Sequence, residues 1–236
     1  MIDIHSHLIP NVDDGAKSPE ETIELIKEAR EAGITDIILT PHYIINSYEQ
    51  NAETLILLKD KLQQIINSEN IKVNLHIGME VYITDNLVEI LKQNKILTLA
   101  GSKYLLMELP LNTNVQYLDM VIFKLIENNI IPIIAHPERY KFVQEDPSKV
   151  RELIESGCLI QSNIGSILGI YGKKAKKTIK YLLINDLINF IATDTHRKNT
   201  IYPLLEKGIK KIEKITGKEK AEELTNLNVQ KILNNT

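Results

Sequence analysis

Two histidines stand one residue apart at the end of the apolar run that opens the chain. The run is Ile2 to Ile4, interrupted by Asp3, and His5 and His7 follow with Ser6 between them. Alternate side chains of an extended strand point to the same face, so both imidazoles are expected to face the same way. Two imidazoles so placed can bind one divalent metal ion. The sequence therefore predicts the start of a metal site here, to which later segments add ligands.

Further histidines and carboxylates stand where later apolar segments end. Imidazole and carboxylate groups suit Mn²⁺, Fe or Zn²⁺, and carboxylates can bridge two ions. Each residue alone could be an ordinary polar group at a strand end, but a carboxylate buried after an apolar strand is costly unless a cation pairs with it. The set is too large for one ion and large enough for two or three. The predicted metal ligands are His5, His7, His42, Glu80, Glu108, His136, Asp194 and His196.

Three other residues with suitable chemistry are assigned elsewhere. His76 lies inside an apolar segment, and we interpret it as structural. Asn163 is expected to support a ligand without being one. Cys158 lacks the arginine that a cysteine phosphatase needs six residues later, because Ile164 stands there. A covalent cysteine mechanism is therefore disfavoured, and Cys158 is expected to pack in the interior.

Several metal ions at fixed positions favour hydrolysis of a phosphate ester. Such ions lower the pKa of bound water and hold the oxygens of an in-line displacement. Arg139 follows His136 by three residues and could place a planar, bidentate cation on the phosphate. The alternative for Arg139 is a salt bridge at the rim with Glu138 or Glu145. With Arg139 as the predicted catalytic residue, the pattern indicates a phosphoric monoester hydrolase.

Short apolar strands alternate with helices along the whole chain, which is typical of a parallel sheet covered by helices. Ser18, Pro19 and Glu21 form a helix-start signal, and a second helix is expected from Tyr48 to Asn70. Seven such units favour a closed or nearly closed α/β barrel, whose chemistry collects at the carboxyl ends of the strands. A doubly wound open sheet is the alternative. The predicted strands cover residues 2–7, 36–40, 73–77, 104–107, 130–135, 159–162 and 187–192.

Composition bears on the binding partners and on the cellular compartment of the protein. The 236 residues are 43% hydrophobic and 25% charged, with a formal net charge of −3, which gives no footprint of a nucleic-acid binder. A single cysteine suits a reducing compartment. We find no secretion signal and no apolar run that could span a bilayer. We therefore expect a cytoplasmic protein without membrane insertion, and, since no linker divides the chain, one domain over residues 1–236.

The motifs resemble those of the PHP (polymerase and histidinol phosphatase) metal phosphoesterases. Within that family, they are most similar to the bacterial manganese-dependent tyrosine-protein phosphatases encoded with capsule and exopolysaccharide genes. The resemblance covers nearly the whole chain. It rests on Met-Ile-Asp-Ile-His-Ser-His at 1–7, Val-Asp-Asp-Gly at 12–15, Thr-Pro-His at 40–42, Gly-Met-Glu at 78–80, Ala-His-Pro-Glu-Arg-Tyr at 135–140 and Ala-Thr-Asp-Thr-His at 192–196.

This resemblance implies a distorted TIM-like (β/α)₇ barrel with a trinuclear site, usually of Mn²⁺, with Fe, Zn or Mg as alternatives. It assigns the eight predicted ligands to the metals and Arg139 to the phosphate. The implied substrate is phosphotyrosine on the tail of a bacterial tyrosine autokinase that controls polysaccharide synthesis. Two alternatives stay open: a small-molecule phosphatase, such as one for histidinol phosphate, and an inactive scaffold.

The chain departs from the family pattern after its last motif. Relatives carry an arginine there, ahead of a proline, whereas this chain has Ile201-Tyr202-Pro203. The nearest basic residues are Arg197 and Lys198. Either of them takes the place of the absent arginine, or the second phosphate contact is lost.

Overall fold

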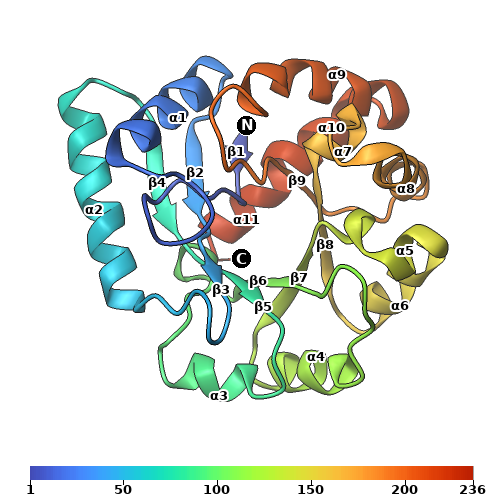
Figure 1. The fold of residues 1–236 in the computed structure, drawn as a ribbon. Coiled ribbons are helices and arrows are strands. Elements are labelled where there is room, and N and C mark those ends of the chain that lie inside the picture. Colours follow the sequence, from blue (N-terminus) through green and yellow to red (C-terminus); the bar gives the residue numbers. More distant parts are fainter. Residues whose placement is uncertain (236) are drawn as a thin grey trace.

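Strands form a central ring and helices surround it (Figure 1). The computed structural model describes residues 1–235. Every strand pair is parallel, which confirms the predicted α/β class. The strands are β1 (Ile2–Asp3), β2 (Asp36–Leu39), β3 (His42–Tyr43), β4 (Asn74–Ile77), β5 (Glu80–Tyr82), β6 (Tyr104–Glu108), β7 (Ile131–Ala135), β8 (Leu159–Asn163) and β9 (Phe190–Ala192).

The first two helices begin at capping residues. The Ser18 hydroxyl accepts the N–H of Glu21 at the start of α1 (Pro19–Glu31), as predicted. The second helix, α2 (Ala52–Ser68), starts later than the predicted Tyr48, because Asn51 caps it and residues 44–48 form a turn. The other helices are α3 (Leu87–Lys92), α4 (Leu118–Glu127), α5 (Lys141–Glu145), α6 (Val150–Glu155), α7 (Ile164–Leu168), α8 (Gly172–Ile184), α9 (Leu205–Thr216), α10 (Lys218–Glu222) and α11 (Asn228–Leu233).

The paired strands form two sheets, and the chain passes directly from a strand of the first sheet into a strand of the second at two places. One has the order β1-β2-β4 and the other the order β3-β5-β6-β7-β8-β9. The chain passes from β2 to β3 through Thr40-Pro41 and from β4 to β5 through Gly78-Met79. Pro41 has no N–H to donate, so the ladder is interrupted there. Each pair acts as one bent segment, and the described residues therefore give the seven predicted segments of a distorted barrel.

The barrel is joined between its first and last strands without a regular ladder. The prediction of a strand over residues 2–7 was too long, since β1 ends at Asp3. Beyond it, the Asp194 N–H donates to the His5 carbonyl at 2.8 Å, and the His7 N–H donates to the Thr195 carbonyl at 2.9 Å. The buried Asp3 carboxylate accepts the N–H of Thr193 at 3.0 Å. These bonds hold His5 and His7 beside the segment that carries Asp194.

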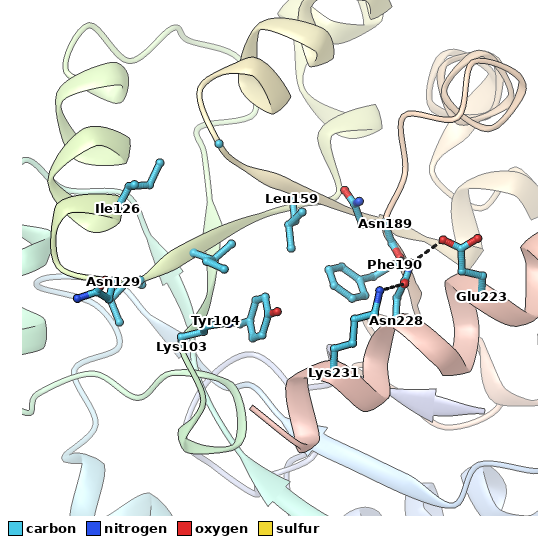
Figure 2. A pocket seen from close by; sticks show the side chains of 13 residues that line it. Lys103, Tyr104, Ile126, Asn129, Leu159, Asn189, Phe190, Glu223, Asn228 and Lys231 are labelled. Carbon is cyan, nitrogen blue, oxygen red and sulfur yellow. Dashed lines mark hydrogen bonds between the residues drawn. The ribbon is translucent and has the colours of Figure 1, made fainter. Parts of the chain in front are cut away.

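The interior of the barrel is filled at its amino-terminal end. Ile4, Ile38, Leu106 and Ile133 form a buried cluster, against which Ile232 of α11 packs. A pocket of about 730 Å³ opens at this end, lined by residues at the starts of β6 to β9 (Figure 2). None of the predicted metal ligands lines it. The predicted site is at the opposite end of the strands.

Residues 1–235 contain no helix that combines the length and the apolar character needed to span a bilayer.

Candidate metal centre

The two N-terminal histidines face each other and two carboxylates. The Nε2 atoms of His5 and His7 are 3.1 Å apart. Oε2 of Glu80 lies 3.3 Å from the first of these nitrogens and 3.4 Å from the second. Oδ1 of Asp194 lies 3.4 Å from both. The structure thus brings together four side chains from three separate segments, as expected from the shared face of His5 and His7.

Glu80 also contacts a second pair of histidines. Its Oε2 lies 2.9 Å from Nδ1 of His42, and its Oε1 lies 3.0 Å from Nε2 of His136. Glu108 lies on the same side, with its Oε1 3.6 Å from Nε2 of His136. Glu80 is fully buried and stands between the two histidine pairs. A carboxylate so placed is suited to bridge two cations.

A third group includes a residue that the sequence prediction missed. Oδ1 of Asp14 lies 3.3 Å from Nε2 of His196 and 3.6 Å from Nε2 of His42. The ring of His196 stacks on that of His7, with centroids 3.9 Å apart. The signal for Asp14 was its place in the turn-prone loop that follows the paired histidines, at residues 12–15. That segment entered the prediction only as part of a family motif.

The structure brings all eight predicted ligands together and adds Asp14. They fall into four overlapping groups, in each of which the possible ligand atoms all lie within 4.8 Å of one another. Because the groups share His5, His7, His42 and Glu80, they make a continuous cluster with room for more than one ion. The groups are His7, Asp14, His42 and His196; His5, His7 and Glu80; His5, His136 and Asp194; and His42, Glu80 and Glu108.

The donor atoms fit a metal better than they fit each other. Nδ1 of His42 and Oε2 of Glu80 are buried and only 2.9 Å apart, yet neither makes a hydrogen bond of acceptable geometry. Nδ1 of His136 is buried and also lacks a partner. Buried polar atoms are rarely left in this state, and an ion not contained in the structure is one of the usual reasons. The residues present therefore fit a group of divalent cations.

Polar residues behind the cluster orient the imidazoles. Nδ1 of His7 donates to Asp13 at 2.8 Å, and Nδ1 of His5 donates to the amide oxygen of Gln161 at 2.9 Å. This turns the Nε2 atoms toward the cluster, as in protein metal sites generally. Asn163 donates to Oδ2 of Asp194 at 2.6 Å, which is the supporting position expected of it. Asp13 and Gln161 were not predicted from the sequence.

Charges within the cluster strongly shift the pKa values of its side chains. Burial alone would lower the pKa of His5, but the carboxylates of Glu80 and Asp194 outweigh it and raise that pKa to about 9. Burial would raise the pKa of Glu80, but His5 and His42 hold it well below the ordinary value. The imidazoles thus supply the positive charge that the buried carboxylates require. A divalent cation supplies the same compensation.

Two of the predicted ligands have unusual backbone conformations. His136 follows β7 with a φ of 34°, and Asp194 follows β9 with a φ of 54°. Residues with a β-carbon rarely adopt this left-handed region, and such strain is concentrated at functional sites. At both positions the turn directs a side chain into the cluster at the end of its strand.

Arg139 is next to the cluster, in a 3₁₀ turn (Pro137–Arg139) after His136. Its Nη1 donates to Oδ2 of Asp194 at 2.9 Å, so the predicted alternative of a rim salt bridge with Glu138 or Glu145 is not observed. The guanidinium carbon lies 4.7 Å from the ring centroid of Tyr171. Three-quarters of the Arg139 side chain is covered, and 26% is exposed.

The two candidates for the absent downstream arginine each have hydrogen-bond or ion-pair partners within the chain. Arg197 donates to the carbonyl oxygens of Gly15 and His196, at 2.5 and 2.8 Å. Lys198 pairs with Glu24 on α1. Arg197 thus connects the loop that carries Asp14 with the turn that carries His196.

Cys158 and His76 lie outside the cluster. Burial raises the pKa of the Cys158 thiol to about 12, which suits a packing role. Nε2 of His76 lies 3.2 Å from Oδ1 of Asp36, within β4 and β2. Neither residue is in any of the four groups.

Comparisons with known proteins identify relatives of this chain. The chain is 39% identical to CapC of Staphylococcus aureus over 199 residues, which cover 83% of this chain and 77% of CapC. It is 33% identical to the tyrosine-protein phosphatase YwqE of Bacillus subtilis (strain 168) over 219 residues, which cover 93% of this chain and 86% of YwqE.

A solved structure shows the same fold almost throughout. It comes from work on YwqE of Bacillus subtilis and CpsB of Streptococcus pneumoniae, which are described there as unique metal-dependent tyrosine phosphatases. It aligns with a TM-score of 0.94 at 32% identity, covering 100% of this chain and 95% of the other. The histidinol phosphate phosphatase of Lactococcus lactis shares the fold more distantly, with a TM-score of 0.60 at 16% identity.

The family comparison covers nearly every residue. The sequence model of the family described as "Capsular polysaccharide synthesis, CpsB/CapC" matches residues 1–234. This confirms the resemblance to the phosphatases of capsule loci. The chain belongs to the CpsB/CapC family of capsular polysaccharide synthesis.

Proposed function

We propose that this protein is a metal-dependent protein-tyrosine phosphatase. The observation that carries the proposal is the position of Glu80, which stands between two pairs of imidazoles while Arg139 approaches the same cluster through Asp194. Relatives at 33% identity are named tyrosine-protein phosphatases. The reaction breaks the bond between phosphorus and the tyrosyl oxygen, adds a water oxygen to phosphorus, and releases tyrosine and inorganic phosphate.

The proposed ligands are the eight predicted residues together with Asp14. They would hold two or three divalent cations, with Mn²⁺ as the expected ion and Fe, Zn or Mg as alternatives. Bound divalent cations lower the pKa of coordinated water and stabilise negative charge on phosphate oxygens. Asp13 and Gln161 keep the Nε2 atoms of His7 and His5 turned toward the cluster. This arrangement limits the reorganisation needed when ions bind.

Arg139 is the proposed phosphate-binding residue. A guanidinium has five N–H donors in a fixed plane, and the bond to Asp194 uses only one of them. The remaining donors can bind phosphate oxygens in the bidentate manner typical of arginine. Its contact with Oδ2 of Asp194 places this cation beside the proposed metal ligands and leaves Oδ1, which faces His5 and His7, available to a metal ion.

The proposed substrate is a protein that carries phosphotyrosine, such as the tail of a bacterial tyrosine kinase that acts in capsule synthesis. The family description and the names of the relatives support this choice. A kinase tail inside the cell also fits the cytoplasmic location that the sequence predicts.

The test is the hydrolysis of a phosphotyrosyl peptide by protein that has been stripped with a chelator and reloaded with Mn²⁺. We expect turnover only after reloading. Histidinol phosphate and a phosphoseryl peptide of the same sequence serve as comparison substrates. Faster turnover of histidinol phosphate would favour the small-molecule alternative, and absence of any metal-dependent turnover would favour the inactive scaffold.

A further inference from the structure

The guanidinium of Arg139 lies over the aromatic ring of Tyr171, which is not one of the proposed metal ligands. Its central carbon is 4.7 Å from the centroid of the Tyr171 ring, within the range of a cation–π contact. Tyr171 lies between α7 and α8, far from Arg139 in the sequence. The contact therefore depends on how the segment between these two helices is built.

That segment has little freedom. Gly169 and Gly172 have φ values of 93° and 91°, in the region that glycine adopts without strain. The N–H of Ile170 donates to the Gly165 carbonyl at 3.0 Å, and the N–H of Gly172 donates to the Gly169 carbonyl at 3.2 Å. The backbone on both sides of Tyr171 is thus fixed by hydrogen bonds.

A glycine on α7 makes room for the ring. A β-carbon added to Gly165 would lie 2.8 Å from Cε2 of Tyr171 and 3.2 Å from Cδ1 of Ile201. Such a short contact with the ring requires a shift of the neighbouring atoms. The absence of a side chain at position 165 therefore allows the ring to lie where it meets Arg139.

The ring is also suited to this contact electrostatically. Burial raises the pKa of the Tyr171 hydroxyl, and the nearby Asp194 raises it further. The hydroxyl thus stays neutral at physiological pH, and the ring presents an uncharged π face to the guanidinium. The Asp194 carboxylate accepts from Nη1 of the same guanidinium. The contact with the Tyr171 ring restrains the plane of the guanidinium, and the hydrogen bond to Asp194 restrains its rotation within that plane.

We propose that Tyr171 is a positioning residue that holds the Arg139 guanidinium in the orientation that binds the substrate phosphate. This inference rests on the proposed function of Arg139 and adds a residue to it. A cation–π contact of this kind contributes enough free energy to change phosphate affinity about 3- to 20-fold. Tyr171 would act through Arg139 alone and would leave metal binding unchanged.

The test compares Tyr171→Ala and Tyr171→Phe in Mn²⁺-loaded protein. For Tyr171→Ala we expect the inhibition constant of inorganic phosphate and the KM for a phosphotyrosyl peptide to rise together, by about 3- to 20-fold. Bound manganese should stay the same. Tyr171→Phe keeps the aromatic face and should restore both constants. Tyr171→Leu removes the π face at similar bulk and replaces the alanine variant if that variant does not fold.

A double-mutant cycle with Arg139→Ala decides whether Tyr171 acts through the arginine. In the Arg139→Ala background, Tyr171→Ala should change phosphate inhibition no further. Phe123→Ala is the matched control, because this aromatic side chain on α4 is 62% exposed and contributes to none of the ligand groups. An unchanged phosphate constant in Tyr171→Ala, an additive effect in the double variant, or lost manganese would each overturn the proposal.

Calorimetric titration of inorganic phosphate into the Mn²⁺-loaded protein separates this inference from the proposed function. If the wild-type protein bound phosphate but did not hydrolyse the phosphotyrosyl peptide, the proposed function would fail. Weaker phosphate binding in Tyr171→Ala but not in Tyr171→Phe would still support the role of Tyr171. Equal phosphate binding by all three proteins would overturn it.

Discussion

Asp194 connects Arg139 with the histidine cluster through its two carboxylate oxygens. Oδ2 accepts from Nη1 of Arg139 at 2.9 Å, while Oδ1 lies 3.4 Å from the Nε2 atoms of both His5 and His7. Asn163 donates to the same Oδ2 at 2.6 Å. One buried carboxylate therefore fixes the distance between the proposed phosphate-binding cation and the proposed metal ligands. Changes to Arg139 and to Asp194 should consequently have different effects.

Arg139→Ala should lower kcat/KM for a phosphotyrosyl peptide by about 10²-fold, since charge-assisted bonds to phosphate contribute a few kcal/mol. Its manganese content should match that of the wild-type protein, because Arg139 donates to Asp194 and offers no metal ligand. Asp194→Ala should abolish activity and also reduce bound manganese. Steady-state kinetics together with elemental analysis of the purified variants check both statements. Loss of manganese from Arg139→Ala would contradict this division of roles.

Two histidines allow a matched comparison of position. His136→Ala removes the imidazole that lies 3.0 Å from Glu80, and we expect activity to fall by at least about 10³-fold because a bound ion is lost or displaced. His76→Ala removes an imidazole of the same size that contacts Asp36 in β2 instead. It should retain wild-type manganese content and most of the activity. Similar losses in both variants would show that general instability, not ligation, explains the effect of His136→Ala.

The strand ends could be predicted from the sequence because parallel strands in an α/β barrel place their carboxyl ends on one face. Glu108 is the last residue of β6, as predicted. His42 and Glu80 instead follow β2 and β4 by three residues and begin the short strands β3 and β5, yet both side chains still reach the cluster. The pairing of His5 with His7 was also predicted correctly, although β1 is shorter than expected. His5 and His7 keep the alternation of an extended chain because bonds to Asp194 and Thr195 hold the backbone beyond the end of β1.

Asp13 and Asp14 could not be placed in this way, because their positions depend on a loop that folds back over His7. Gly15 makes the fold-back possible, since a β-carbon there would lie 2.0 Å from the His7 carbonyl oxygen. Tyr171 escaped prediction for a similar reason. Its contact with Arg139 depends on the loop geometry at Gly169 and Gly172 and on the missing side chain at Gly165, which no spacing rule describes.

Asp14→Ala tests the loop contribution directly. Asp14 faces His42 and His196 and is half-exposed, so its removal should weaken the outermost ion without disturbing the buried groups around Glu80. We expect the protein to bind about one ion fewer per chain and to lose activity, while its thermal midpoint in the presence of chelator stays unchanged. Metal titration by calorimetry measures the stoichiometry. An unchanged stoichiometry would remove Asp14 from the proposed ligand set.

Cys158 provides a test of mechanism that depends on pH. Burial raises the pKa of its thiol to about 12, and only the thiolate reacts with alkylating reagents. At pH 8.5 the native protein should therefore hold about 10⁻³ or less of this residue as thiolate, whereas an unfolded chain holds roughly half. Iodoacetamide should label the native protein slowly at pH 8.5, label it rapidly in denaturant, and leave phosphotyrosine hydrolysis intact.

Cys158→Ser should likewise retain most of the activity, because this side chain is buried and belongs to none of the ligand groups. Inactivation by iodoacetamide in step with labelling of Cys158 at neutral pH would indicate a nucleophilic cysteine and would exclude hydrolysis by the metal centre alone.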